Sequence, residues 1–355
     1  MINKKFWIGK KVLITGHTGF KGCWLSIWMK ILGAKIAGYS LNPITQKNFF
    51  NLAKLKRIFE IEKRKNIQDY KSLENFIKKF KPGIIFHLAA QPQVLESFND
   101  PYDTVKTNVI GTTNLLEITK KYKFIKSVVI ITTDKVYRNA NKKIKFSEDY
   151  ALGGDDIYSS SKASADIITS SYQKSFFKNS KCGISTARAG NCIGGGDWTK
   201  FRILTDSSEA FLKNKNLLVR NPKSVRPWQH VLEPLLGYII LAQKNFSNVS
   251  SKYSGSWNFG PVHRKHYKVK DFVNLFKLKL ESKSKIILKR TEDNREKNFL
   301  DLSSKKSIKI LKWKPILNMD QTLELTARWY LAYKQKKDLF KISSKQIQYF
   351  THLFK

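Results

Sequence analysis

The chain has 355 residues, of which 41% are hydrophobic and 13% aromatic, so it is neither disordered nor collagen-like. No apolar run reaches the roughly 18 residues that span a membrane, and the basic start is not followed by a signal-peptide cleavage site. Three cysteines without CxxC spacing argue against a disulfide framework or a zinc ribbon, and they fit a reducing cytoplasm.

The formal net charge of +39 suits a polyanion partner such as a nucleic acid. However, only 11 of the 66 basic residues are arginines, and the lysines are spread along the chain without a basic tail. We therefore favour a lysine-rich solvated surface and expect no nucleic-acid and no membrane partner. A polyanion partner, or attraction of a small acidic substrate, remains the alternative.

The first half of the chain alternates strand-like and helix-like segments. This rhythm predicts an α/β fold with a Rossmann-type doubly wound parallel sheet and right-handed crossovers. Strands are expected at residues 11–15, 35–39, 84–88, 127–132 and 184–187, and helices at 22–32, 72–80 and 114–121.

After about residue 190 the alternation breaks. Loops are expected at 194–196 and 221–227, helices at 233–243, 303–311 and 321–333, and a strand at 256–259. We therefore predict a first domain over residues 1–190, to which 229–258 returns. A smaller, partly interleaved substrate domain comprises 191–228 and 259–355, and the cleft between the domains is the default ligand site.

A glycine-rich turn joins the first expected strand to the first helix. Residues 16–22 read GHTGFKG, with GxxGxxG spacing, and such glycines let backbone N–H groups approach a pyrophosphate at a helix N-terminus. The strand–turn–helix context distinguishes this motif from a plain glycine-rich turn. Contacts to a dinucleotide cofactor are expected from Gly16, Thr18, Gly19, Phe20, Lys21 and Gly22.

The acidic partner usual in dinucleotide folds is missing. The second strand ends at Ser40, and no acid occurs before Glu60, so NAD cannot be preferred over NADP on this ground. Candidates for the adenosine ribose are Ser40, Asn42 or Thr45, and Asn66 and Ile67 are candidates for the adenine.

Tyr158 and Lys162 stand four residues apart, so on a helix they share a face. A nearby ammonium lowers a tyrosine pKa and makes the phenol a usable base. The YxxxK pattern alone is common on surfaces. It gains weight here because Thr132-Thr133-Asp134-Lys135 follows an apolar strand, and open α/β sheets bind ligands at the carboxyl ends of their strands.

These motifs together resemble the extended short-chain dehydrogenases/reductases that act on nucleotide sugars. The likeness rests on TGHTGFKG at 15–22, HLAAQP at 87–92, NVIGTTNLLE at 108–117 and YSSSK at 158–162. TTDKVYRN at 132–139, ARAGNCIGGGDW at 187–198 and RNPKSVRPWQHVLEPLLGY at 220–238 are similar to the branch of 4,6-dehydratases acting on CDP-glucose. The resemblance implies bound NAD, oxidation at C4 of the glucosyl unit, loss of water across C5 and C6, and hydride return to C6.

The resemblance also implies catalytic roles. Tyr158 is the base at the C4 hydroxyl, Lys162 holds its pKa low and bonds the nicotinamide ribose, and Thr133 bonds the C4 oxygen. Asp134 is the acid for the C6 hydroxyl and Lys135 the base at C5; the alternative for these two is a local ion pair. Further cofactor contacts are expected from Leu88, Ala89, Ala90, Gln91, Asn108, Thr132 and Arg188.

The nucleotide diphosphate needs cationic or N–H donors, and arginine offers bidentate ones. Arg226 is the main candidate, with Asn191 as a second donor. Gln91 is expected to face the sugar, and Trp228 and His230 to orient the loop. The residues expected to shape the pocket are Gly196, Asp197, Trp198 and Arg202, with Trp198 stacking on the base. Alternatively, the tryptophans are plain core and Arg188 is a structural ion pair.

Some positions leave alternatives open. His87, inside a strand, is interpreted as a core histidine, and no cluster has metal-ligand spacing, so no metal is expected. Arg295-Glu296-Lys297 replaces the His-Glu-Ala usual in the family, which puts a substrate contact there in doubt. A 4-epimerase or reductase, or a non-catalytic nucleotide- or polyanion-binding protein, remains possible, although Asp134-Lys135 favours dehydration. The family also implies a homodimer or homotetramer, built through helices around 108–121 and 158–173.

Overall fold

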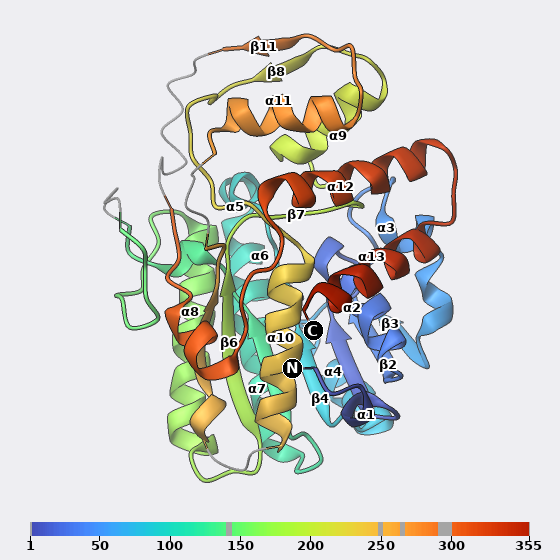
Figure 1. Ribbon diagram of the computed structural model, residues 1–355. Coiled ribbons are helices and arrows are strands. Elements are labelled where there is room, and N and C mark those ends of the chain that lie inside the picture. The colour runs from blue at the N-terminus through green and yellow to red at the C-terminus, as the bar shows by residue number, and fades with distance from the viewer. Residues whose placement is uncertain (1, 140–143, 248–250, 263–266, 290–299, 355) are drawn as a thin grey trace.

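Seven parallel strands form the central sheet of the computed structural model, which describes residues 2–139, 144–247, 251–262, 267–289 and 300–354. Their order is β10-β6-β5-β4-β1-β2-β3, so the direction of winding reverses between β1 and β4 (Figure 1). Such a reversal opens a crevice at the carboxyl ends of the strands. This is the predicted doubly wound sheet. Its strands are β1 (Lys11–Thr15), β2 (Lys35–Ser40), β3 (Ile61–Arg64), β4 (Ile84–His87), β5 (Ser127–Ile131), β6 (Gly183–Ala189) and β10 (Gly255–Phe259).

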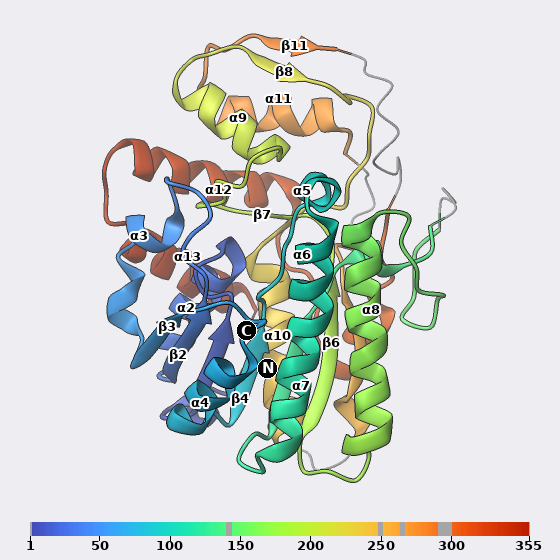
Figure 2. The same ribbon diagram turned by 180° about the vertical axis from the view of Figure 1, so that it is seen from behind.

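Both faces of the sheet are buried, because successive side chains of a strand point to opposite faces. Val12 and Ile14 of β1 pack on one side, Leu13 packs on the other, and none of the three is exposed. One face is covered by α2 and α10, with α13 packed on α2, and the other face is covered by α4, α7 and α8 (Figures 1 and 2). The long helices are α2 (Phe20–Ile31), α4 (Tyr70–Phe80), α7 (Gly111–Lys121), α8 (Ile157–Tyr172), α10 (Leu232–Ser247), α12 (Met319–Lys334) and α13 (Leu339–Leu353).

A smaller unit lies beyond the carboxyl ends of the strands, at the top of Figure 1. There β8 (Leu217–Val219) pairs in parallel with β11 (Ile286–Leu288), next to α9 (Ile203–Leu212) and α11 (Val269–Lys279). A second pair, β7 (Cys192–Ile193) with β9 (Gln229–His230), brings two expected substrate segments side by side. The shorter helices and turns are α1 (Lys4–Trp7), α3 (Phe49–Leu52), α5 (Val94–Asn99), α6 (Pro101–Val105), η1 (Leu55–Ile58), η2 (Lys106–Ile110), η3 (Asp134–Val136), η4 (Gln173–Phe177), η5 (Ser251–Tyr253) and η6 (Ser307–Leu311).

The two C-terminal helices bridge the smaller unit and the sheet, because α12 packs on α9 and α11 as well as on α13. Helix α13 packs on α2, and the rings of Trp28 and Phe350 meet edge to face with centroids 5.8 Å apart. The division of the chain into two domains stays a prediction. Among the described residues, no helix is both long and apolar enough to cross a bilayer.

Two expected helices differ from the observed ones, and several observed elements, among them α9, α11 and α13, were not expected. The first helix begins at Phe20 because Gly19 is its N-cap, and the helix expected at 303–311 is reduced mainly to the π-helical turn η6. Helix α13 was not expected, although Leu339, Ser343, Ile347 and Phe350 are all buried along one face. Two small polar residues in its middle, Ser343 and Ser344, weaken the apolar periodicity.

Glu233 fastens the C-terminal segment to α10. One carboxylate oxygen accepts the N–H groups of Ile316 and Leu317 at 2.8 and 2.7 Å, and Trp313 Nε1 donates to the Glu233 carbonyl oxygen at 2.9 Å. The side chain is fully buried, and this burial raises the pKa of Glu233 to about 7 even though the two N–H groups oppose it.

Glu233→Gln should remove a pH-dependent loss of stability. Since the folded pKa lies above the unfolded value of 4.5, the folded state binds more protons between these values, and stability falls as the pH rises from about 4.5 to about 7. Glutamine keeps an oxygen for both N–H groups without the charge. Urea unfolding from pH 4 to 8 should show that the free energy of unfolding of the variant, relative to that of the parent, rises with pH by up to about 3 kcal/mol. Parallel pH curves for the two proteins would contradict this assignment.

Candidate active site

The turn from β1 into α2 is built around glycines. Gly16 has a φ of +71°, and a Cβ there would lie 2.7 Å from the backbone nitrogen of Ala89. Gly19 is the N-cap of α2, and no described side chain caps this helix. A Cβ on Gly19 would meet little besides the Gly16 carbonyl oxygen, so the first N–H groups of α2 face an open approach. The turn fits the diphosphate of a dinucleotide.

A pocket opens beside this turn, between the sheet and the segment that follows β7. The glycine-rich turn, the loop after β2, the loop after β4 and the 196–199 segment each form one wall. Its lining residues are Thr18, Gly19, Phe20, Pro43, Ile44, Thr45, Asn48, Phe49, Pro92, Gln93, Gly196, Asp197, Trp198 and Thr199. Expected cofactor and substrate residues therefore line the same pocket.

Ser40, at the end of β2, is hydrogen-bonded to Thr18 (Oγ to Oγ1, 2.8 Å). The acid near this point is Glu62 of β3, which pairs in register with Gly38 of β2. On the same strand, Arg64 pairs with Ser40. Glu62 accepts hydrogen bonds from Arg64 and lies 3.1 Å from His17 Nε2. Sequence reasoning missed this network, because the relevant acid lies on the neighbouring strand rather than at the end of β2.

The loop after β4 is fixed by Asn108. The Asn108 side chain accepts the Gln91 N–H at 2.8 Å and donates to Ser161 Oγ at 2.9 Å, which ties this loop to α8. The Gln91 amide nitrogen donates within its own region, to Thr104 Oγ1 and the Gln93 carbonyl oxygen. Gln91 therefore braces the loop, and the expectation that its side chain faces the sugar stays a prediction.

The residues at and directly after the end of β4 are closely packed at the bottom of the crevice. Leu88, Ala89 and Ala90 are half-buried there, at the edge of the crevice. His87 is buried and hydrogen-bonds on both ring nitrogens, to Thr15 at 2.8 Å and Thr112 at 3.2 Å. The interpretation of His87 as a core histidine is confirmed.

Helix α8 presents Tyr158 and Lys162 toward the end of β5. Asp156 caps the helix by accepting the Ser159 N–H at 2.8 Å, which places Tyr158 in the first turn. The Lys162 ammonium donates to the Ile131 carbonyl oxygen at 2.7 Å. Burial, with the nearby Lys21 cation as a second cause, lowers the pKa of Lys162 to about 8.

The segment after β5 turns at once into η3. Thr133 caps this turn, and its hydroxyl donates to Asp134 Oδ1 at 3.0 Å. Asp134 is only 2% exposed, and its second oxygen has no hydrogen-bond partner among the described residues. Burial raises the pKa of Asp134 to about 6, against the opposing effects of Lys135, Thr133, Lys21 and Arg226. The carboxyl group is thus partly protonated near neutral pH.

Tyr158 differs from the expectation. Burial raises the pKa of Tyr158, and the groups that oppose this are the Thr133 hydroxyl and the Lys21 and Arg202 cations, rather than Lys162. The Lys162 ammonium is instead directed to the strand carbonyl of Ile131. The expected lowering of the phenol pKa by Lys162 is therefore corrected in this structure.

Lys21 is a residue whose position sequence reasoning missed. It was expected among the cofactor contacts of the glycine-rich turn. Its ammonium lies near the Cys192 thiol and the Tyr238 and Tyr158 hydroxyls, and it also acts on Asp134 and Lys162. The signal in the sequence is weak: Lys21 is simply the basic residue in the first turn of a helix that begins at the crevice.

Two expected substrate cations also face this centre. Arg226 acts on the Asp134 carboxylate, and Arg202 acts on Tyr158. Asp197 is fully buried and accepts from Arg202 Nη1 at 2.7 Å and from the Thr199 N–H at 3.1 Å. Asp197 therefore orients Arg202, whose side chain stays 39% exposed.

The segment at 194–198 is held by aromatic side chains from distant parts of the chain. A Cβ on Gly195 would collide with the Trp329 ring, and one on Gly196, whose φ is +86°, with Phe49. Trp24 Nε1 donates to the Gly195 carbonyl oxygen at 2.9 Å, and the Tyr330 hydroxyl to the Asp197 carbonyl oxygen at 2.9 Å. The segment can therefore take only this path.

The three tryptophan and histidine candidates are more buried than expected. Trp228 is 2% exposed and stacks on Phe272 with centroids 4.4 Å apart, and His230 is fully buried. For Trp228 this burial fits the alternative of a plain core residue, and the role of both residues in orienting the loop stays a prediction. Trp198 is 6% exposed, packs edge-on against Tyr330, and still lines the pocket. Asn191 is half-buried where β7 begins.

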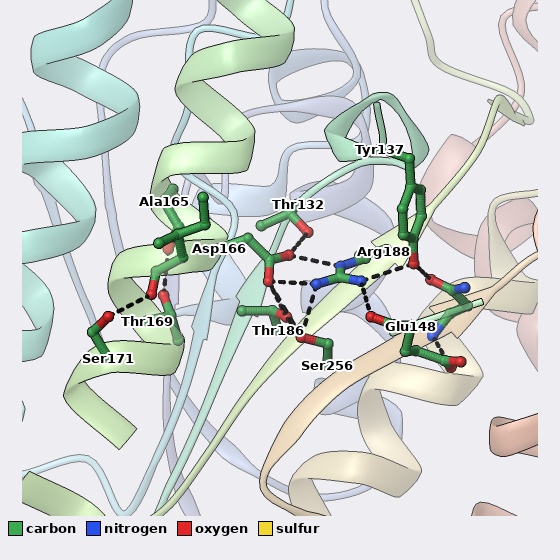
Figure 3. Close-up of polar contacts among 12 residues, drawn as sticks. Thr132, Tyr137, Glu148, Ala165, Asp166, Thr169, Ser171, Thr186, Arg188 and Ser256 are labelled. Carbon is green, nitrogen blue, oxygen red and sulfur yellow. Dashed lines mark hydrogen bonds and ion pairs between the residues drawn. The ribbon is translucent and has the colours of Figure 1, made fainter. Parts of the chain in front are cut away.

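Arg188 is the clearest correction. It was expected to contact the cofactor, but it is 2% exposed and all three of its nitrogens donate to protein oxygens (Figure 3). Nε and Nη2 bind the Asp166 carboxylate at 2.9 and 2.8 Å, and Nη1 donates to the Tyr137 hydroxyl at 2.8 Å. The alternative of a structural ion pair is the one that the geometry supports.

Three further candidates are embedded in the fold. Ile67 is 4% exposed, Asn66 accepts the Gln68 N–H through its side chain, and Thr132 donates to Asp166 at 3.0 Å. Arg295-Glu296-Lys297 lies outside the described residues. In the described part of the chain, no group of three or more His, Cys, Asp or Glu side chains is placed to hold a metal ion.

Known proteins show the same organisation. A family model described as GDP-mannose 4,6 dehydratase matches residues 13–326. CDP-glucose 4,6-dehydratase of Salmonella typhimurium is 40% identical over 98% of both chains. A UDP-glucose 4-epimerase of Thermotoga maritima superposes with a TM-score of 0.79 at 20% identity, covering 92% of this chain and 99% of that one.

A dTDP-glucose 4,6-dehydratase of Bacillus anthracis, solved in complex with NAD, superposes with a TM-score of 0.77 at 24% identity. It covers 94% of this chain and 100% of its own, and at this identity the likeness supports the fold. Together with the family match over residues 13–326, these comparisons identify the chain as a member of the GDP-mannose 4,6-dehydratase family of extended short-chain dehydrogenases/reductases.

Proposed function

We propose that the protein converts CDP-glucose into CDP-4-keto-6-deoxyglucose with NAD as its cofactor. The observation that carries this proposal is the Asp134–Lys135 pair at the end of β5, next to Thr133 and close to Tyr158. The Salmonella relative, matched over 98% of both chains, bears the name of the same activity.

The glycine-rich turn and the first N–H groups of α2 would hold the cofactor diphosphate. Ser40 and Thr18 lie where the second strand ends, as an adenosine ribose requires. When bound, NAD accepts the hydride from C4 of the sugar and later returns it to C6. The chain itself supplies the proton transfers.

In the first step, Tyr158 removes the proton of the C4 hydroxyl while Thr133 hydrogen-bonds the C4 oxygen. Lys21 and Arg202 favour the phenolate, because each places a positive charge near the hydroxyl of Tyr158. Lys162, anchored on the Ile131 carbonyl oxygen, holds its ammonium at the floor of the crevice.

In the second step, the C4 ketone acidifies the C5 proton, and Lys135 takes it; Lys135 gives this proton back to C5 when the hydride is returned to C6. Asp134 gives its proton to the departing C6 hydroxyl, and its raised pKa of about 6 keeps a protonated fraction available near neutral pH. A 4-epimerase or reductase needs no acid at C6. The buried Asp134 therefore favours dehydration over these alternatives.

The nucleotide diphosphate would bind to Arg226 and Arg202, with Asn191 as a further donor. The 196–198 segment, held by Asp197 and its aromatic neighbours, would shape the pocket for the cytidine.

We also propose a homodimer or homotetramer. Large apolar side chains are exposed on α6, η2 and α8, the helices around the two expected contact segments. They are Tyr102, Val105, Ile110, Ile157 and Ile167. A cytoplasmic location and a role in deoxysugar synthesis for surface polysaccharide (O-antigen or lipopolysaccharide) belong to the same proposal, supported by three free cysteines.

Incubation with NAD and with CDP-, dTDP- and UDP-glucose in parallel tests the reaction. Mass spectrometry of the nucleotide sugars should show loss of one water from CDP-glucose alone. Loss of water from another sugar would retain the chemistry and overturn the cytidine preference. An epimerised sugar of unchanged mass would overturn dehydration itself.

Tyr158→Phe should reduce turnover by about a hundredfold to ten-thousandfold, the usual contribution of a positioned base. Binding of CDP-glucose, measured by calorimetry, should remain. Tyr172→Phe is the matched control, since this hydroxyl lies on the same helix and bonds Glu117 instead. Turnover of Tyr158→Phe equal to that of the control would remove Tyr158 as the base.

Lys135→Ala should stop the reaction after oxidation at C4, because the C5 proton then has no base. Rapid mixing should show near-ultraviolet absorbance of reduced cofactor that persists without dehydrated product. Lys174→Ala, at an exposed position near the end of α8, serves as the control. Normal product formation in Lys135→Ala would contradict the role of this lysine.

A further inference from the structure

Asp166 lies four residues after Lys162, which lies four residues after Tyr158, so the three side chains lie along the same side of α8. It is 1% exposed, and its two oxygens accept hydrogen bonds from β6, from the residue that follows β5, and from Ser256 of β10 at 3.3 Å. Thr132 and Thr186 each donate at 3.0 Å, and Arg188 donates twice (Figure 3). The helix that carries Tyr158 and Lys162 is thereby joined to β5 and β6.

Arg188 extends this connection to the far side of η3. Its Nη1 donates to the Tyr137 hydroxyl at 2.8 Å and to the Glu148 carbonyl oxygen at 3.1 Å. The Tyr137 hydroxyl in turn donates to Asn258 Oδ1 on β10 at 2.7 Å. Tyr137 directly follows η3, the turn that contains Asp134 and Lys135.

Both ends of the Thr133–Val136 segment are therefore tied to one ion pair. Thr132 precedes the segment and binds Asp166, while Tyr137 follows it and binds Arg188. A buried ion pair is costly unless every polar atom is satisfied, and this one is satisfied only when helix, strands and turn are all in place.

We infer that the Asp166–Arg188 pair, through Thr132 and Tyr137, is a positioning device that sets Asp134 and Lys135 against Tyr158 and Lys162. The inference rests on the proposed function. Oxidation at C4 uses Tyr158 on the helix and Thr133, which lies next to the Thr132 contact. Elimination across C5 and C6 uses Asp134 and Lys135, which lie farther along the turn toward Tyr137. Loosening the turn side of the device therefore slows elimination more than oxidation.

Tyr137→Phe is the principal test. It removes the hydroxyl between Arg188 and Asn258 but keeps the ring, which stacks on Phe146 at 5.2 Å and 8°. Single-turnover experiments with NAD and CDP-glucose should show reduced cofactor forming within about twofold of the parent rate, and dehydrated product forming about tenfold more slowly, the scale of one lost buried hydrogen bond. The 4-keto sugar that still carries its C6 hydroxyl should accumulate, and acid quench followed by mass spectrometry should detect it.

Tyr122→Phe is the matched control. Its hydroxyl donates to Glu74 at 3.1 Å, before the start of β5 and hence at the opposite end of that strand from Thr133. It should lose a comparable contact without changing the ratio of the two rates. A similar change of ratio in both variants would assign the effect to general loosening and overturn the inference.

Asp166→Asn is the second variant, with thermal unfolding followed alongside. It should shift the same ratio in the same direction as Tyr137→Phe, since asparagine keeps an acceptor for Arg188 but weakens the pair. Unchanged rates, or equal slowing of both steps, in the folded variants would overturn the inference alone. A parent protein that forms neither reduced cofactor nor dehydrated product would instead overturn the proposed function, and the inference with it.

Discussion

The carboxylate of Asp166 is the point at which a helix and three strands of the sheet meet. Removing a carboxylate from water costs several kcal/mol, and the cost is offset only if cations and hydroxyls surround it. Here Thr186 and Arg188 of β6 do so, together with Thr132 directly after β5. Because this contact fixes the strand ends relative to α8, the geometry of the crevice depends on it.

Burial also sets the electrostatics of the site, in opposite directions for acids and bases. It raises the pKa of the Asp134 carboxyl and lowers that of the Lys162 ammonium, since both charged forms lose water. Lys21 and Arg226 add positive charge around Asp134. The crevice therefore carries an excess of cations, which are part of the formal net charge of +39 and complement the anionic nucleotide sugar of the proposed reaction.

The fold was predictable because its signals are local and repeated. They include apolar runs such as Val12–Ile14, a helix that ends just before Pro82, and glycines at the first turn. The motif residues Thr133, Asp134, Tyr158 and Lys162 were predictable for the same reason, since each lies in a short pattern. The residues that buried side chains contact across the fold were not predictable. Nothing local reveals that Arg188 meets Asp166, 22 residues earlier, or that Trp228 stacks on Phe272.

The same limit explains the electrostatic corrections. The pKa of Tyr158 depends on burial and on Lys21, which is 137 residues away in sequence, so four-residue spacing to Lys162 gave the wrong cation. The bracing role of Gln91 was not predictable either, because its amide donates to Thr104 across a loop. Both contacts form only when segments that are apart in the sequence come together in the folded protein.

The packing of Gly195 against Trp329 has a consequence for how the protein is made. The segment that lines the pocket is supported from below by a helix encoded near the end of the chain, and Tyr330 of that helix also holds Asp197. All strands of the central sheet precede α12 in the chain, so the pocket segment gains its support only from residues that are synthesised later. A polypeptide cut short before α12 would lack this support, together with the α13 side chains that pack on α2.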